Sequence, residues 1–398
     1  MKILMLLEKD FPPDARVEKE ALSLIEEGYE VHIASVSSNK NFEETEKYKN
    51  IHLHRKYQGF LMKKFSPTSL ILPFYFWWWS KYVNDLFKTH KFDAIHVHDL
   101  PLSKVGFKMS KRYNAKLICD QHEYYSNWIV NTAHYNTFLG KIVKKLSNWR
   151  QYEKRYLNKA DLVITVEEPL RQCYIREVGV AEEKIICVPN TSRKTIFNYD
   201  NVDYNVAEKY KDKFVIFYAG GITKLKNIDT AIEALPFLKE KIPNILLLFA
   251  AKISKYADPL GKAKKSRVYN LVEYAGYIPH EKIPSYIAAS DICFHVPRLY
   301  NEEVNRTIQT KIYQYLLMYK PIVVGQAKMA KNFVEKNNIG LAIKQSDPQD
   351  FAKKILKLKE NPNLYAKIQE NCKKVAKQNS WENTIIPMLN RYKTLLYE

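Results

Sequence analysis

The sequence predicts an α/β protein made of two doubly wound units in tandem. Three observations lead to this prediction. The length of 398 residues exceeds that of one compact core and suits two domains. Short apolar runs alternate with segments of helical periodicity through the first half, and the same alternation restarts at Phe214. Strands separated by helices pair in parallel, because each crossover requires a helix.

The first unit is expected to span residues 1–195. It opens with the apolar strand Ile3–Leu7, followed by a helix that includes Val17 and Ile25 and ends at Gly28. Further apolar runs predict the strands Glu30–Ser35, Ala94–Val97, Lys116–Cys119 and Leu162–Thr165, and the run Ile185–Pro189 closes this unit. The polar segment of about 191–213 lacks a clear period, and we interpret it as the linker between the units.

The second unit is expected to span residues 212–380. Its first strand, Phe214–Ala219, runs into Gly220-Gly221 and a helix over about 228–238. Later strands are predicted at Ile245–Ala250, Val272–Tyr274, Ile292–His295 and Ile322–Val324. Residues 381–398 predict a terminal helix that packs back on the first unit. Two such units facing each other would leave a cleft at the carboxyl ends of both sheets, where open α/β sheets bind ligands.

The composition restricts the choice of partners. Hydrophobic residues make up 46% and charged residues 27% of the chain, as in soluble globular proteins. The formal net charge of +20 favours a nucleotide phosphate, an anionic membrane surface or a nucleic acid as partner. Lysine-rich solvated helix faces explain the charge equally well. No recognised nucleic-acid-binding motif occurs, so we expect no nucleic acid.

The cysteines and the apolar runs indicate a cytoplasmic protein. The five cysteines have no metal-ligand spacing and are odd in number, which favours reduced thiols. The apolar run at the start is too short for a signal peptide. The most apolar segment, Leu70–Trp79, has about half of the roughly 20 residues that a membrane span needs.

Charged and polar groups follow two predicted strands of the first unit. These are His96-Val97-His98-Asp99 and Asp120-Gln121-His122-Glu123. Strand ends are where such sheets place functional groups. His122, flanked by two carboxylates, could be a base, an oriented hydrogen-bond donor, a metal ligand or an ordinary loop histidine. A metal is disfavoured, because we expect His96 and His98 to alternate across the strand, so that only one faces the cleft.

The second unit contains two candidate anion sites. Gly220-Gly221 follows a strand and precedes Lys224 and Lys226, so backbone amides could approach a phosphate while lysines supply charge. An ordinary strand-to-helix turn is the alternative. Thr310 and Lys311 open a helix, whose N-terminus favours an anion. A plain amphipathic helix is the alternative there.

The segment from Phe74 to Phe87 combines Trp77-Trp78-Trp79 with nearby lysines. Those lysines are Lys63, Lys64, Lys81 and Lys88. Aromatic residues beside lysines suit the interface of an anionic membrane. A buried helix of the first unit is the alternative.

Several motifs occur in one order along nearly the whole chain. They are Asp14–Ala21 with Gly28-Tyr29-Glu30-Val31, Phe92–Asp99, Asp120–Glu123, Lys159–Val166 with Val188-Pro189-Asn190, Tyr274–Pro279 and Ala289–Ile292. Together they resemble the retaining GT-B glycosyltransferases of glycosyltransferase family 4, in the branch that builds surface polysaccharides. The resemblance implies two Rossmann-like domains that face a cleft, and a sugar transfer from a nucleotide-sugar to a glycan or lipid-linked acceptor at the inner face of the membrane.

The resemblance also implies roles for individual residues. His122 would position the reacting sugar and stabilise the transition state, and Lys226 would contact the donor diphosphate. Other donor-binding residues would be Gly220, Gly221, Tyr277, Thr310, Lys311 and Gln314. Asp14, His98, Asp99 and Glu123 would lie on the acceptor side. The nucleotide-sugar is a substrate, and neither a cofactor nor a metal is expected.

Several positions depart from the family pattern. The family has an arginine where this chain has Gly221, and a pair of glutamates where it has Arg306 and Gln314. Gln314 can still form hydrogen bonds with a ribose, but without charge assistance. Glu302 and Glu303 lie just upstream and could supply a carboxylate. A second hypothesis therefore stays open, in which a donor-site-degenerate relative acts as a non-catalytic binding or partner subunit.

Overall fold

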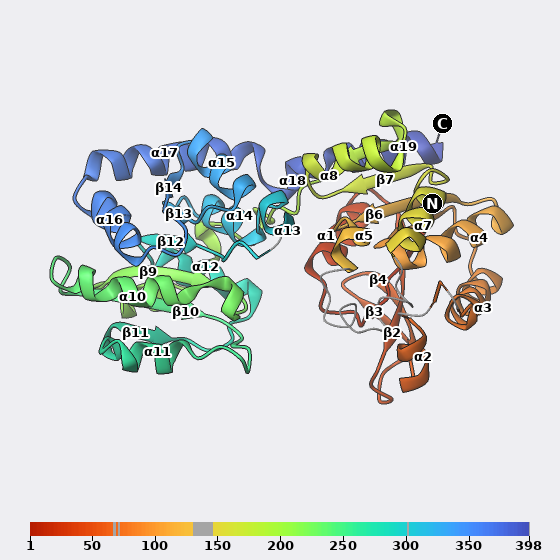
Figure 1. The fold of residues 1–398 in the computed structure, drawn as a ribbon. Helices are drawn as coiled ribbons and strands as arrows, with labels where there is room; N and C mark the ends of the chain where they lie inside the picture. The colour runs from red at the N-terminus through yellow and green to blue at the C-terminus, as the bar shows by residue number, and fades with distance from the viewer. Residues whose placement is uncertain (67–68, 71, 130–145, 301, 398) are drawn as a thin grey trace. The chain divides into compact units, whose positions relative to one another are not determined.

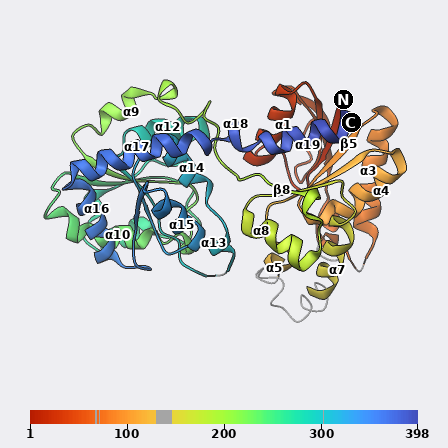
Figure 2. The ribbon, with the colours of Figure 1, turned by 90° about the horizontal axis from the view of Figure 1, so that it is seen from above.

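The computed structural model describes residues 1–66, 69–70, 72–129, 146–300 and 302–397. It divides into two compact units, of which the first comprises Met1–Pro189 with Ile385–Glu398 and the second Asn190–Thr384. Helices cover both faces of the sheet in each unit (Figure 2). The expectation of two doubly wound α/β units with parallel sheets is confirmed.

The sheet of the first unit has the strand order β3-β4-β2-β1-β5-β6-β7-β8 among the described residues (Figure 1). All neighbours are parallel except β3 and β4. The strands are β1 (Lys2–Leu6), β2 (Glu30–Ser37), β3 (Thr45–Tyr48), β4 (Ile51–Tyr57), β5 (Ala94–His98), β6 (Lys116–Gln121), β7 (Leu162–Thr165) and β8 (Ile185–Cys187). The helices are α1 (Ala15–Glu26), α2 (Phe60–Phe65), α3 (Phe74–Thr89), α4 (Ser103–Tyr113), α5 (Tyr125–Ile129), α7 (Leu146–Leu157), α8 (Glu168–Cys173) and α19 (Ile386–Tyr397).

The sheet of the second unit has the order β11-β10-β9-β12-β13-β14, with every neighbouring pair parallel. Its strands are β9 (Phe214–Ala219), β10 (Ile245–Ala250), β11 (Val272–Tyr274), β12 (Ile292–His295), β13 (Ile322–Val324) and β14 (Gly340–Ala342). Its helices are α9 (Tyr204–Lys209), α10 (Ile228–Lys239), α11 (Pro259–Lys265), α12 (Ile283–Ala288), α13 (Glu302–Arg306), α14 (Thr310–Leu317), α15 (Lys328–Lys336), α16 (Pro348–Lys359), α17 (Pro362–Gln378) and α18 (Trp381–Thr384).

The parallel order explains why the apolar runs are continuous. Every residue of β9 and β10 is buried, as expected for strands with helices on both faces. In each sheet the strand order reverses its direction at a central pair of strands, which is β1/β5 in the first unit and β9/β12 in the second. Such reversal points create a crevice at the carboxyl ends of the strands.

Two expectations about the connections were wrong. The segment 191–213 is not a free linker, because Phe197 and Tyr210 are buried in the core of the second unit. The terminal segment is not one helix, because α18 and α19 are separate on either side of Ile385. Helix α19 packs on the first unit, where the Tyr392 hydroxyl lies 2.7 Å from His96 Nδ1.

The aromatic segment is partly buried and partly exposed. In α3, Trp79 is fully buried in the core of the first unit, whereas Trp77 is 59% exposed. The rings of Phe74 and Trp77 pack edge-to-face with their centroids 5.5 Å apart. Phe60 and Leu61 on α2 are also exposed. In the described part of the chain, no helix combines the length and apolar character needed to cross a membrane.

Candidate functional site

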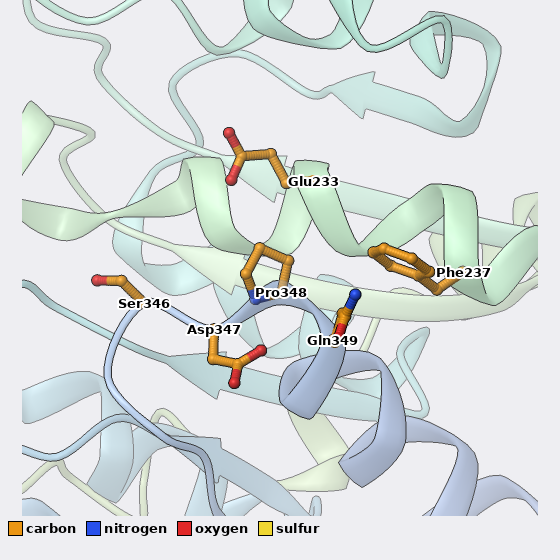
Figure 3. A pocket seen from close by; sticks show the side chains of 6 residues that line it. All are labelled: Glu233, Phe237, Ser346, Asp347, Pro348 and Gln349. Atoms are coloured by element: carbon orange, nitrogen blue, oxygen red, sulfur yellow. The ribbon is translucent and has the colours of Figure 1, made fainter.

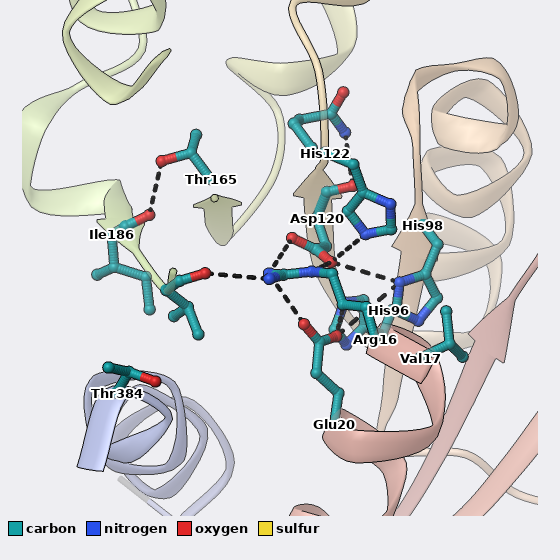
Figure 4. A network of polar contacts seen from close by, with 12 residues as sticks. Arg16, Val17, Glu20, His96, His98, Asp120, His122, Thr165, Ile186 and Thr384 are labelled. Atoms are coloured by element: carbon teal, nitrogen blue, oxygen red, sulfur yellow. Dashed lines mark hydrogen bonds and ion pairs between the residues drawn. The ribbon is translucent and has the colours of Figure 1, made fainter. Parts of the chain in front are cut away.

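Asp120 is the centre of a buried polar network at the carboxyl end of β6 (Figure 4). Arg16, in the first turn of α1, donates to both of its carboxylate oxygens at 3.0 Å and to the carbonyl of Val188 at 3.0 Å. Such a bidentate pair fixes both side chains in one geometry. Asp14 accepts bonds from the backbone N–H groups of Arg16 and Val17, and thereby caps α1. The helix start therefore positions the guanidinium that holds Asp120.

His122 bridges two carboxylates. Its Nε2 lies 2.7 Å from Asp120 Oδ2, and its Nδ1 lies 3.3 Å from Asp99 Oδ1. Burial opposes the charged form, but the charges of Asp99 and Asp120 and the hydrogen bond to Asp120 raise the pKa of His122 to about 9. His122 is therefore an imidazolium at pH 7, with an N–H directed at each carboxylate. In this state it can donate hydrogen bonds but cannot act as a general base.

Asp99 reaches His122 because of an unusual backbone conformation. It directly follows β5 and has φ of +64°, which is rare for residues other than glycine. Its backbone N–H donates to the carbonyl of Asp120 at 2.8 Å. Its side chain is 35% exposed, whereas that of Asp120 is fully buried. The Asp99 contact is thus the longer and more accessible of the two that hold His122.

The expectation that only one of His96 and His98 faces the site was wrong. Residues two apart on a strand share a face, and the two buried rings stack with centroids 4.4 Å apart. Together with Glu20 and Asp120 they could offer four ligand atoms to a metal ion. The Arg16 guanidinium lies 2.9 Å from Glu20 and 3.0 Å from Asp120, however, and its charge disfavours a cation there.

The remaining predicted residues of the first unit lie close to this network. Asp14 forms an ion pair with Lys9 at 2.5 Å. Burial opposes ionisation of Asp14, but the neighbouring Lys9 charge keeps its pKa below the usual value. Glu123 is half-buried, and its charge acts on Lys9. Sequence reasoning assigned no role to Lys9 or Arg16, although Arg16 lies within the opening motif.

In the second unit, most of the predicted donor residues line one pocket of about 330 Å³. Among its lining residues are Gly220, Gly221, Tyr277, Thr310, Lys311 and Gln314. Gly220 directly follows β9 with φ of +114°, a conformation that favours glycine. A Cβ there would lie 3.0 Å from Lys311 Nζ, so glycine also leaves room for that ammonium group. Thr310 is the first residue of α14, and its helix N-terminus faces this pocket.

Lys226 and Lys311 lie close together without a carboxylate partner among the described residues. Burial, and then the charge of Lys226, lower the pKa of Lys311 well below its usual range. Burial alone lowers the pKa of Lys226. Lys311 instead lies over the ring of Tyr218, with Nζ 3.7 Å from the centroid. Two half-buried lysines without a carboxylate partner among the described residues form a site for an anion.

Gln314 is buried on α14, and its Nε2 lies 3.2 Å from His280 Nε2. Tyr277 is 74% exposed at the rim of the same pocket. Of the upstream glutamates, Glu302 is exposed on α13, and Glu303 follows it in the sequence of that helix. Glu302 is not one of the described lining residues of the pocket.

Two other hollows of the second unit do not contain the predicted donor residues. The larger, of about 560 Å³, lies between α10 and the start of α16 and contains the carboxylates of Glu233 and Asp347 (Figure 3). These acidic groups are unsuited to a phosphate. The other, of about 340 Å³, includes Lys224, so the structure separates Lys224 from Lys311.

Comparison with known proteins agrees with this division into two units. Residues 16–191 match the family model described as Glycosyltransferase Family 4, and residues 202–375 match the one described as Glycosyl transferases group 1. The two matches and the fold place the chain among the GT-B glycosyltransferases.

Individual relatives match over nearly their whole length. The chain is 25% identical to EpsD of Bacillus subtilis, a glycosyltransferase by name, over 92% of this chain and 89% of that protein. It is 21% identical to MJ1069 of Methanocaldococcus jannaschii, an uncharacterized glycosyltransferase, over 90% of this chain and 88% of that protein. The structure of Anabaena HepE in complex with UDP superimposes with a TM-score of 0.73 at 16% identity, covering 99% of this chain and 100% of that one.

Proposed function

We propose that this protein transfers a sugar from a nucleotide-sugar to a glycan or lipid-linked acceptor in cell-surface polysaccharide biosynthesis, with retention of the anomeric configuration and without a metal. The observation that carries the proposal is the anion site formed by Lys226 and Lys311 beside Gly220 and the N-terminus of α14. A diphosphate gains negative charge when its bond to the sugar breaks. Fixed positive groups stabilise that charge without reorganisation at the moment of reaction.

The donor would enter the pocket of the second unit by its diphosphate. Gly220 and Gly221 leave the backbone accessible, and the helix N-terminus adds a partial positive charge. Gln314 would bind the ribose through its amide, and Tyr277 at the rim would border the base. The HepE structure is known with UDP-glucose as well as with UDP. UDP-glucose is therefore the first donor to test.

His122 is proposed as the group that positions the transferred sugar. As an imidazolium it would donate a hydrogen bond to a sugar hydroxyl, and Asp99 is the partner it would release for this purpose. The bond to Asp120 would persist, because Asp120 is fully buried and also held by Arg16. Deprotonation of the acceptor hydroxyl is not assigned to His122. That proton would pass to the departing diphosphate.

A peripheral position at the inner face of the membrane is part of the proposal. The exposed side chains of Phe60, Leu61, Phe74 and Trp77 lie on α2 and the start of α3. Lys63 and Lys81 are exposed on the same two helices. Apolar side chains beside lysines bind anionic lipid surfaces through both burial and charge.

Thermal unfolding in the presence of a panel of nucleotide-sugars tests the donor site, because a ligand that binds only the folded state raises the midpoint. Product formation with the donor found in this way tests the activity, and the anomeric configuration of the product tests retention. Binding without transfer to any acceptor would favour the partner-subunit hypothesis. If no nucleotide-sugar shifts the midpoint, the donor assignment fails.

A further inference from the structure

Four histidines gather at the amino end of the sheet in the first unit. His32 lies on β2, His52 and His54 lie on β4, and His90 directly follows α3. The two strands pair in parallel, with His32 opposite His52 and Ala34 opposite His54. Alternate residues of a strand share a face, so the three strand histidines project from the same side of the sheet. We call these four residues the histidine cluster.

The cluster is separate from the proposed sugar site. His32 is the third residue of β2 and His52 the second of β4, whereas His122 follows the carboxyl end of β6. The strands β2 and β6 run in the same direction through β1 and β5. The histidine cluster therefore lies toward the amino ends of the parallel strands, and His122 lies at the carboxyl ends of the same sheet.

Hydrogen bonds define the tautomer of His32. Its Nε2 lies 2.8 Å from Glu30 Oε1, and Glu30 is itself held by Lys2 at 2.9 Å. An ionised carboxylate only accepts, so His32 Nε2 carries the proton. In the neutral ring, Nδ1 then has a lone pair, and it lies 2.9 Å from His54 Nε2. A carboxylate that orients one ring nitrogen, so that the other nitrogen keeps its lone pair, is the arrangement found around metal-binding histidines.

We propose that His32, His54 and His90 bind a divalent transition-metal ion, with Zn²⁺ as the first candidate. One nitrogen from each ring lies within 4.8 Å of the other two. Zinc–nitrogen bonds of about 2.0–2.1 Å in a tetrahedron place two ligand nitrogens about 3.3 Å apart. The observed 2.9 Å between His32 Nδ1 and His54 Nε2 needs only a small outward movement of the rings.

The ion would take the place of the proton now shared by His32 and His54. His54 would carry its proton on Nδ1 instead, so both rings stay neutral. His32 and His54 are buried, whereas His90 and His52 are half-buried, which leaves the ion an approach from solvent. Imidazole suits Zn²⁺, and a water molecule could complete the tetrahedron. The bound ion would join β2, β4 and the end of α3.

The experiment is a calorimetric titration of Zn²⁺ alone into the full-length protein, treated with chelator and free of any histidine tag. Wild type is expected to bind one Zn²⁺, and His54→Gln and His90→Gln are each expected to weaken binding by about 10-fold or more. Glu30→Gln removes the carboxylate that orients His32, and it should weaken binding by about 10-fold. His52→Gln is the matched control, because it removes an imidazole of the same cluster but no proposed ligand.

Thermal unfolding gives a second readout that does not depend on activity. Zn²⁺ should raise the unfolding midpoint of wild type and of His52→Gln more than that of His90→Gln. His90 is half-buried beyond the end of its helix, so this variant is expected to fold. Wild type that fails to bind Zn²⁺ would overturn the proposal. Loss of binding in His52→Gln with retention in His90→Gln would overturn the ligand set and place the ion between His32, His52 and Glu30.

Discussion

Replacing Asp99 by asparagine should lower the pKa of His122. The two charges are 3.3 Å apart, which corresponds to about 1.3 kcal/mol in water and about 5 kcal/mol at an effective dielectric constant of 20. These energies equal shifts of about 0.9 and about 3.7 pKa units. Because the side chain of Asp99 is 35% exposed, solvent screens the pair, and we expect a fall of about one to two units. Asparagine has nearly the same size and shape as aspartate, so the backbone should be retained.

The assay is a titration of the histidine ring resonances by NMR, with His122→Gln used to assign the His122 signal. The wild-type ring is expected to titrate near pH 9, and the Asp99→Asn ring at a lower pH. Glu18→Gln, a substitution of another carboxylate in the first unit that pairs with Lys49, should leave the His122 signal unchanged. A wild-type pKa below 7, or equal values in wild type and Asp99→Asn, would refute the bridged imidazolium.

Four further predictions concern His122, the two donor-pocket residues Lys311 and Gln314, and the exposed Trp77. The pKa of His122 is raised from 6.5 to about 9, so its pairing should add up to about 3 kcal/mol to the unfolding free energy below pH 6.5. This contribution should be lost as the pH rises through 9, and His122→Gln should flatten the pH dependence of stability in urea titrations. The turnover number of His122→Gln should fall by roughly 10²–10⁴-fold relative to wild type. Lys311→Ala should weaken donor binding in calorimetry, whereas the exposed Lys239→Ala should not. Gln314→Ala should cost about 1 kcal/mol in the same titration. Trp77→Ser should reduce sedimentation with anionic vesicles, and salt should reduce it for wild type; equal recovery on neutral vesicles would contradict this.

The sequence was sufficient to predict the fold where the apolar pattern is continuous. Buried parallel strands such as Phe214–Ala219 and Ile245–Ala250 stand out because both faces are covered. It was insufficient at the sheet edge, where β3 and β4 were not predicted. The residues of β3 alternate between exposed and half-buried positions, and β4 carries polar side chains. Such strands are stabilised by their neighbours in the sheet more than by an apolar pattern of their own.

The candidate site could be predicted in the second unit better than in the first. Glycine after a strand and lysine at a helix start are local signals, and the structure places Gly220 and Lys311 in one pocket. The partners of His122 are not local in this sense. Arg16 and Asp120 are separated by 104 positions along the chain, and only the pairing of β5 with β6 brings Asp99 beside His122. The histidine cluster was missed for the same reason, although His52 and His54 share a strand face.

The two candidate sites, one in each unit, differ in how their charges are balanced, and this difference indicates what each site needs from a ligand. In the first unit the charges around His122 are paired: Arg16 holds Asp120, and Asp120 and Asp99 hold His122. These side chains are therefore oriented before any ligand arrives, as a group that must position a sugar requires. In the second unit, Lys226 and Lys311 repel each other and have no carboxylate partner among the described residues. That repulsion destabilises the ligand-free protein, and a bound diphosphate would remove it. Anion binding should therefore stabilise the second unit more than the first. Hydrogen exchange with and without pyrophosphate can test this, because greater protection of α14 than of α1 is expected, and equal protection would contradict the assignment of the lysine pair as the donor phosphate site.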